Sequence, residues 1–155
     1  MLEAKKITAS YREERGIRGF ARGKKQVLEN INFSLEKGQC IGMIGMNGVG
    51  KSTLLSILAG VHKPDSGQLL FQGKDLFLKE NRKQLRKLSG YVPQDNPLME
   101  ELSVFDNLRL WYIDQKKLEE ELETGRLSEF GLKEYLKVPV RKLSGGLKKR
   151  VNIAC

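Results

Sequence analysis

The first third of the chain carries the alternation of apolar and polar residues that is typical of β-strands. Residues 2–11 predict a first strand with polar interruptions, and residues 27–33 predict a second, with one face made of Val27, Glu29, Ile31 and Phe33. A turn at residues 36–39 leads to the apolar run 40–44, which has the length of a short strand. We therefore expect three strands before residue 45.

Helical spacing begins directly after residue 50. Apolar residues recur there at the period of a helix, namely Leu54, Leu55, Ile57 and Leu58. Gly60 is a natural end for this helix, and residues 64–67 predict a turn into a further strand at 68–71. Residues 79–89 predict a short helix containing Leu85 and Leu88, and a short strand at 91–92 ends at Pro93. Strands and helices alternate in this part, which indicates an α/β core.

The last third is helical in pattern. Ser103 and Asp106 have the spacing of a capping box, followed by a face made of Phe105, Leu108 and Tyr112. A charged helix is predicted at 114–123 with Leu118 and Leu122, and a further turn at 127–130 ends at Gly131. We expect a helical subdomain inserted into the α/β core.

Composition and charge narrow the class of protein. The 155 residues suffice for one domain or for part of a larger one, and the net charge of +9 suits a nucleotide, a nucleic acid or an anionic membrane surface. No apolar run has the length of a membrane span, and the N-terminus has no signal-peptide core. Cys40, Cys155 and His62 form no spaced cluster, so no disulfide framework or zinc site is predicted and His62 is expected at the surface. We expect a cytoplasmic chain.

A basic segment interrupts the first two strands. Residues 12–25 contain three glycines and six positive charges and predict a loop. The favoured interpretation is a solvated connection; contact with lipid headgroups or with a partner is the alternative.

Residues 45–53 fit the phosphate-binding P-loop pattern G-x-x-x-x-G-K-[ST]. Glycines allow several backbone N–H groups to surround a polyphosphate, and the helix that follows adds the positive end of its dipole. Lys51 would place a mobile charge on the β- and γ-phosphates, Ser52 would put its hydroxyl on Mg²⁺, and Thr53 would hold phosphate. We expect the nucleotide contacts at Gly45, Asn47, Gly48, Gly50, Lys51, Ser52 and Thr53. A glycine-rich turn that merely caps a buried helix is the alternative.

A second motif stands near the end of the chain. Residues 143–146 read Leu-Ser-Gly-Gly, and Leu147, Val151 and Ala154 follow at helical spacing while Lys148, Lys149 and Arg150 face elsewhere. Ser144 and two glycines at a helix start make an N-terminus that is suited to an anion, although such a sequence is also an ordinary cap.

With a P-loop, a Tyr-Val-Pro-Gln turn and a Leu-Ser-Gly-Gly helix start in this order, the chain resembles the nucleotide-binding domain of ATP-binding cassette (ABC) transporters. The resemblance runs from residue 2 to residue 155. By position, Tyr11 matches the aromatic that stacks on adenine, Gln94 matches the glutamine that reaches Mg²⁺ and the attacking water, and residues 143–147 match the signature motif. The signature's usual fifth residue is Gln, where this chain has Leu147, which is similar to the export-type branch.

The resemblance implies a fold and a set of partners. The fold is α/β, a P-loop core with an antiparallel β subdomain in residues 1–94 and a helical signature subdomain in residues 95–155. The cofactors are ATP and Mg²⁺, the latter held by Ser52 and Gln94. Two cassettes would sandwich ATP, with Ser144, Gly145 and Gly146 contacting the nucleotide of the partner cassette. A membrane-spanning permease subunit would be the other partner, placing the chain on the inner face of the cell membrane.

The family's later motifs, a strand ending in Asp, a catalytic Glu and a switch His, have no match in these 155 residues. We therefore expect an incomplete ABC-type domain, truncated before the Walker B strand, that holds nucleotide but alone does not turn it over. Three alternatives stay open: a nucleotide-binding fragment or pseudo-ATPase, a soluble ABC protein acting on nucleic acid or ribosomes, and another P-loop class such as a kinase or GTPase.

Overall fold

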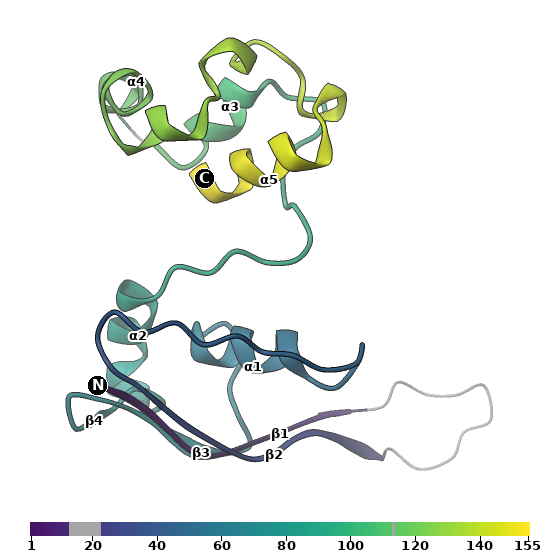
Figure 1. Ribbon diagram of the computed structural model, residues 1–155, viewed down its shortest axis with the longest axis vertical. Helices are drawn as coiled ribbons and strands as arrows, with labels where there is room; N and C mark the ends of the chain where they lie inside the picture. The colour runs from purple at the N-terminus through teal and green to yellow at the C-terminus, as the bar shows by residue number, and fades with distance from the viewer. Residues whose placement is uncertain (13–22, 113) are drawn as a thin grey trace. The chain divides into compact units, whose positions relative to one another are not determined.

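The structure is a computed structural model that describes residues 1–12, 23–112 and 114–155. It forms two compact units, Met1–Tyr91 and Val92–Cys155, which we call unit 1 and unit 2 (Figure 1). The sequence places a domain boundary after residue 94, and the assignment of 1–94 and 95–155 as functional subdomains stays a prediction. Within the described residues, no helix combines the length and the apolar character needed to cross a bilayer.

Unit 1 is built on an antiparallel sheet of four strands in the order β2-β1-β3-β4. The strands are β1 (Leu2–Arg12), β2 (Lys24–Leu35), β3 (Ser66–Phe71) and β4 (Lys74–Asp75). β1 pairs with β2 on one side and with β3 on the other. The strands predicted at 2–11, 27–33 and 68–71 are confirmed, and all three extend further than their patterns indicate.

The predicted face of β2 is correct at Ile31 and Phe33, which pack on the core, and wrong before Asn30, because the strand contains a bulge. Ile7 pairs with Ile31 but Ala9 pairs with Leu28, so β2 has one residue more than β1 over this interval, and Asn30 takes a positive φ of 51°. A bulge reverses which side chains face the core. As a result Leu28 is buried and Glu29 is exposed.

Two helices pack on this sheet. α1 (Lys51–Leu58) and α2 (Arg82–Leu88), the latter preceded by the 3-10 turn η1 (Lys79–Asn81), lie over the same face of the sheet (Figure 1). Their buried side chains join those of the strands in one core, made of Ala4, Ile7, Ala9, Leu28, Leu54, Ile57, Leu69, Leu76 and Leu85. The helices predicted after residue 50 and at 79–89 are confirmed, and Gly60 follows the end of α1 with φ 73°.

Two predicted strands are absent from the described residues. The runs 40–44 and 91–92 form no strand. Ile44 is 99% exposed and Ile41 is also exposed, whereas Met43 packs on the core. A strand exists only where a neighbour accepts its ladder of hydrogen bonds, and none of the described residues pairs with these runs.

The predicted loop at 12–25 is only partly correct. Arg12, Lys24 and Lys25 belong to strands, and Arg12 pairs with Lys24. Residues 13–22, with Arg15, Arg18 and Arg22, lie outside the described residues.

Unit 2 is helical. Its elements are α3 (Val104–Arg109), α4 (Gln115–Glu123), the 3-10 turns η2 (Arg126–Phe130), η3 (Lys133–Tyr135) and η4 (Val140–Lys142), and α5 (Gly145–Ala154). They enclose a separate core, whose buried members are Val104, Leu108, Leu118, Leu122, Leu127, Leu132, Val140, Leu143, Val151 and Ala154. The predicted starts are confirmed at Ser103 and Ser144, since each side chain accepts a hydrogen bond from the N–H three residues later.

Candidate functional site

The P-loop follows the run 40–44 and leads into α1. Gly50 is the N-cap of α1 with φ 99°, and a Cβ atom there would lie 2.8 Å from the Val27 carbonyl oxygen and 2.9 Å from Leu28 Cδ2. Gly48 also has a positive φ, of 83°. Only glycine adopts such a conformation at low cost, and only glycine leaves room for β2 at residue 50. The local sequence therefore produces a tight loop that ends in a helix N-terminus.

Lys51 folds back over this loop. Its Nζ donates hydrogen bonds to the carbonyl oxygens of Gly45 at 2.7 Å and of Met46 at 2.8 Å. Gly45, Asn47, Gly48 and Ser52 are exposed, and Thr53 is half-buried. An ammonium group, exposed loop N–H groups and the free first turn of a helix can together bind an anion with several oxygens.

Tyr11 lies beside this helix. Its hydroxyl donates to Thr53 Oγ1 at 3.2 Å, while 44% of the residue remains exposed. Its ring forms a T-shaped pair with His62, with the centroids 6.4 Å apart, and His62 Nδ1 lies 3.0 Å from Ser56 Oγ. The structure therefore brings Tyr11 to the residues of the P-loop helix, and it leaves His62 exposed as expected.

The other predicted site residues belong to unit 2. Gln94 is exposed in a bend after Pro93, and Ser144 caps α5 by accepting from Leu147 N at 3.3 Å. Gly145 and Gly146 are exposed, and a Cβ at either would meet nothing within 4 Å. The packing described for this chain therefore does not explain the two glycines, in contrast to Gly50.

The P-loop fits a polyphosphate, because the Lys51 ammonium and the N-terminus of α1 both favour an anion. In residues 1–12, 23–112 and 114–155, no group of three or more His, Cys, Asp or Glu side chains gathers that could hold a metal ion. Mg²⁺ commonly takes one or two protein oxygens together with phosphate oxygens, and the exposed Ser52 hydroxyl can supply one.

The sequence pattern missed the residues that hold the Gln94 segment. Lys149 Nζ donates to the Pro93 carbonyl oxygen at 2.6 Å, and Asn152 Nδ2 donates to Asn96 Oδ1 at 3.1 Å. The pattern indicated only that Lys149 faces away from the core. No apolar periodicity singles out Asn152, because its neighbours on the same helix face, at i−4 and i−3, are Lys148 and Lys149.

The family profile with the description "ABC transporter" matches residues 28–155. The chain is 35% identical over 132 residues to the lantibiotic transport ATP-binding protein SrtF of Streptococcus pyogenes, covering 85% of this chain and 55% of that protein. It is 35% identical over 160 residues to the linearmycin resistance ATP-binding protein LnrL of Bacillus subtilis, covering 99% of this chain and 46% of that protein. The chain thus spans about half the length of these curated relatives.

Solved structures agree in fold. A dimeric ATP-binding cassette in a post-hydrolysis state, bound to ADP and Pi, superposes with a TM-score of 0.75 at 25% identity, covering 99% of this chain and 68% of that one. A bacterial ABC transporter cassette, also dimeric, gives a TM-score of 0.77 at 23% identity, with the same coverage of 99% and 68%. The predicted fold class, an ABC ATPase-like α/β domain, is therefore confirmed.

Proposed function

This chain belongs to the ABC transporter family, and from that premise we propose that it forms the ATP-binding part of a transporter. The observation that carries the proposal is the P-loop: an exposed glycine loop closed by Lys51 and ending at the N-terminus of α1. In this proposal residues 45–53 bind the phosphates of ATP. Bound ATP would supply free energy through cleavage of its β–γ phosphoanhydride bond, and the residues of this chain would bind and orient its phosphates.

Each residue then has a distinct role. Lys51 exchanges the carbonyls of Gly45 and Met46 for phosphate oxygens, so its charge moves a short way from the loop to the ligand. Ser52 supplies a hydroxyl to Mg²⁺, and Tyr11, fixed through Thr53, offers one ring face to adenine. Gln94 in unit 2 is assigned to the Mg²⁺ and water side of the nucleotide.

The partners and the location also belong to the proposal. Gly145 and Gly146 have open space around them, which suits the close approach of a nucleotide held by a second cassette. Solved relatives described as dimeric support that arrangement. The proposal also includes a membrane-spanning permease subunit as a partner. It places the chain on the inner face of the cell membrane and gives export as the direction of transport.

Calorimetric titration of ATP with Mg²⁺ into the purified chain tests the proposal. Replacing Lys51 with Ala removes a charged donor from the phosphates and is expected to weaken binding about 10- to 100-fold. Lys74→Ala, an exposed lysine of β4, is the matched control and should bind as the parent does. Equal affinity of Lys51→Ala and the parent contradicts the proposal, provided that their circular dichroism spectra agree.

A further inference from the structure

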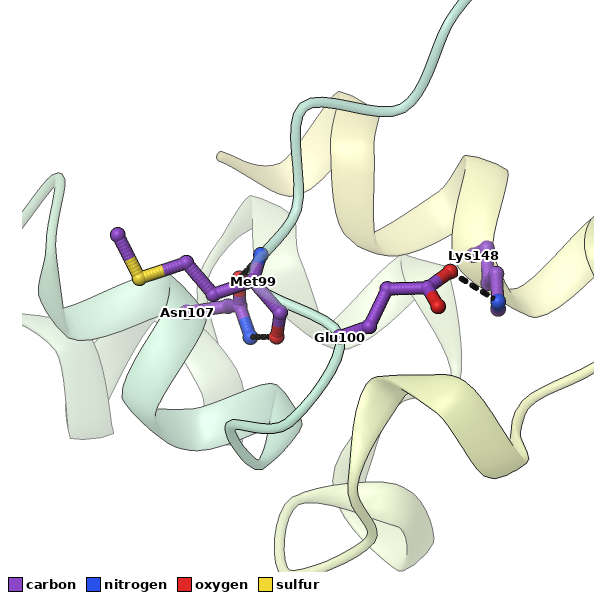
Figure 2. Close-up of polar contacts among 4 residues, drawn as sticks. All are labelled: Met99, Glu100, Asn107 and Lys148. Atoms are coloured by element: carbon purple, nitrogen blue, oxygen red, sulfur yellow. Dashed lines mark hydrogen bonds and ion pairs between the residues drawn. The ribbon is translucent and has the colours of Figure 1, made fainter.

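The segment that carries Gln94 is fastened to α5 at three points inside unit 2. Lys149 holds the carbonyl of Pro93 at 2.6 Å, Asn152 holds Asn96 at 3.1 Å, and Lys148 Nζ lies 2.6 Å from a carboxylate oxygen of Glu100. Figure 2 shows the ion pair between Lys148 and Glu100. All three donors stand on the helix that begins immediately after Ser144.

The first of these contacts acts on the backbone of Gln94 itself. The carbonyl of Pro93 and the N–H of Gln94 belong to one planar peptide unit. A charged donor that holds this oxygen therefore restricts the orientation of the peptide plane that contains the Gln94 Cα atom, and with it the direction of the side chain. Lys149 is half-buried, where such a hydrogen bond is stronger than at an open surface.

The hydrogen bond from Asn152 is buried, whereas the ion pair between Lys148 and Glu100 is more exposed to solvent. Asn152 is buried, so the loss of its partner would leave an amide unsatisfied. The side chain of Glu100 is 60% exposed, and an ion pair of this kind contributes little by itself. Lys149 and Asn152 are therefore the two residues on which the attachment mainly depends.

The far end of the segment is held by α3. Asn107, only 2% exposed, accepts from Met99 N at 2.8 Å and donates to the carbonyl oxygens of Met99 at 3.0 Å and Ser103 at 2.9 Å. The two bonds to Met99 are drawn in Figure 2. In addition, Arg141 N donates to the Glu100 carbonyl oxygen at 2.9 Å. The chain from residue 93 to residue 103 is therefore held at five positions, namely Pro93, Asn96, Met99, Glu100 and Ser103.

We infer that Lys149 and Asn152 are positioning residues that make the Gln94 segment and the Ser144–Gly146 helix start one rigid element. A displacement of α5 then carries Gln94 with it, and a displacement of Gln94 reaches Ser144 through the same bonds. The consequence for nucleotide rests on the proposed function, because both motifs are assigned to ATP there. The attachment itself does not, because it is a property of the chain without ligand.

Amide hydrogen exchange of the chain without nucleotide tests this inference. Within residues 94–100 the amides of Leu98 and Met99 are hydrogen-bonded. Lys149→Met keeps the apolar stem and removes the donor that holds the segment, so these two amides are expected to exchange about tenfold faster than in the parent. Lys149→Arg restores a charged donor and should bring the exchange back toward the parent rate. Asn96→Ala removes the acceptor of Asn152 and should accelerate the same amides.

Lys137→Met, an exposed lysine of the same unit, is the matched control and should leave residues 94–100 unchanged. Equal exchange of these amides in Lys149→Met and Lys137→Met would overturn the inference. Acceleration that spreads evenly over α3, α4 and α5, with a lower urea midpoint, would overturn it as well, because Lys149 would then stabilise the unit without positioning the segment. Neither result bears on the ATP titration, so this failure and that of the proposed function are separate.

Discussion

The two units differ in how completely their apolar residues are buried. In unit 2 side chains from α3, α4, α5 and the 3-10 turns close around one core. In unit 1 the sheet covers α1 and α2, but the run 40–44 leaves Ile41 and Ile44 exposed. A helix satisfies most of its own backbone hydrogen bonds and needs only a face to pack on, whereas a strand needs a neighbour for every bond. Unit 1 therefore depends more than unit 2 on contacts between segments that are distant in the sequence.

The two units also differ in net charge. Residues 1–91 contain seventeen Lys and Arg against eight Asp and Glu, which accounts for the whole net charge of +9, while residues 92–155 contain eleven of each. The proposed phosphate site therefore belongs to the unit that carries the entire positive excess. An anionic ligand is attracted to that unit before any specific contact forms.

Truncating one apolar residue in each unit should change the free energy of unfolding by very different amounts. Leu108→Ala removes a fully buried side chain from unit 2 and is expected to lower the free energy of unfolding by about 2–5 kcal/mol. Ile44→Ala changes a residue of unit 1 that is already in solvent and should alter it by less than about 0.5 kcal/mol. Urea unfolding followed by circular dichroism measures both. A loss at Ile44 as large as that at Leu108 would show that the run 40–44 is packed.

The next contrast uses glycines of the two proposed nucleotide motifs. Gly50→Ala meets a positive φ and the carbonyl of Val27, so the expected loss is about 2–4 kcal/mol. Gly146→Ala meets open space inside α5 and should be neutral or stabilise by up to about 1 kcal/mol. The same urea measurement applies. If Gly146→Ala is stable but no longer dimerises with nucleotide, Gly146 is required for contact with a partner cassette. If Gly146→Ala lowers the free energy of unfolding as much as Gly50→Ala does, the predicted difference between the two glycines is wrong.

The smallest expected effect concerns the one cysteine of unit 2. Burial raises the pKa of the Cys155 thiol from 9.0 to about 11. The folded state therefore keeps a proton that the unfolded state releases, so this contribution to stability is complete below pH 9 and is lost as pH rises to 11. Urea midpoints at pH 8 and at pH 11 should differ less in Cys155→Ala than in the parent. An identical pH dependence in both would contradict the assignment, and Cys40→Ala, exposed in unit 1, is the control.

Local signals explain why the helices could be predicted from the sequence. Ser103 and Ser144 cap their helices with their own side chains, and the buried positions of α4, Leu118 and Leu122, follow one another at i and i+4. The P-loop could also be predicted, because its glycines take positive φ values that the sequence motif already requires. Such features need no information from far along the chain.

Features that depend on distant residues could not be predicted in the same way. The face of β2 is set by a bulge at Asn30 that appears only through pairing with β1. The short apolar runs at 40–44 and 91–92 predict strands, yet a strand forms only beside a pairing partner, which such a run does not identify. The contact between Lys149 and Pro93 joins residues 56 positions apart, which no periodicity reveals.

Because the chain is synthesised from its N-terminus, the core of unit 1 can form earlier than the core of unit 2. Every strand of the unit 1 sheet has left the ribosome once residue 75 is free, so its slow, non-local pairing of β1 with β3 can start while unit 2 is still being made. The unit 2 core includes Val151 and Ala154, so it stays open until α5 emerges. Through that interval the segment after Gln94 exists without Lys149 and Asn152 to hold it. A pause in translation near residue 145 would therefore expose unit 2, with unit 1 already able to fold, to chaperones and proteases.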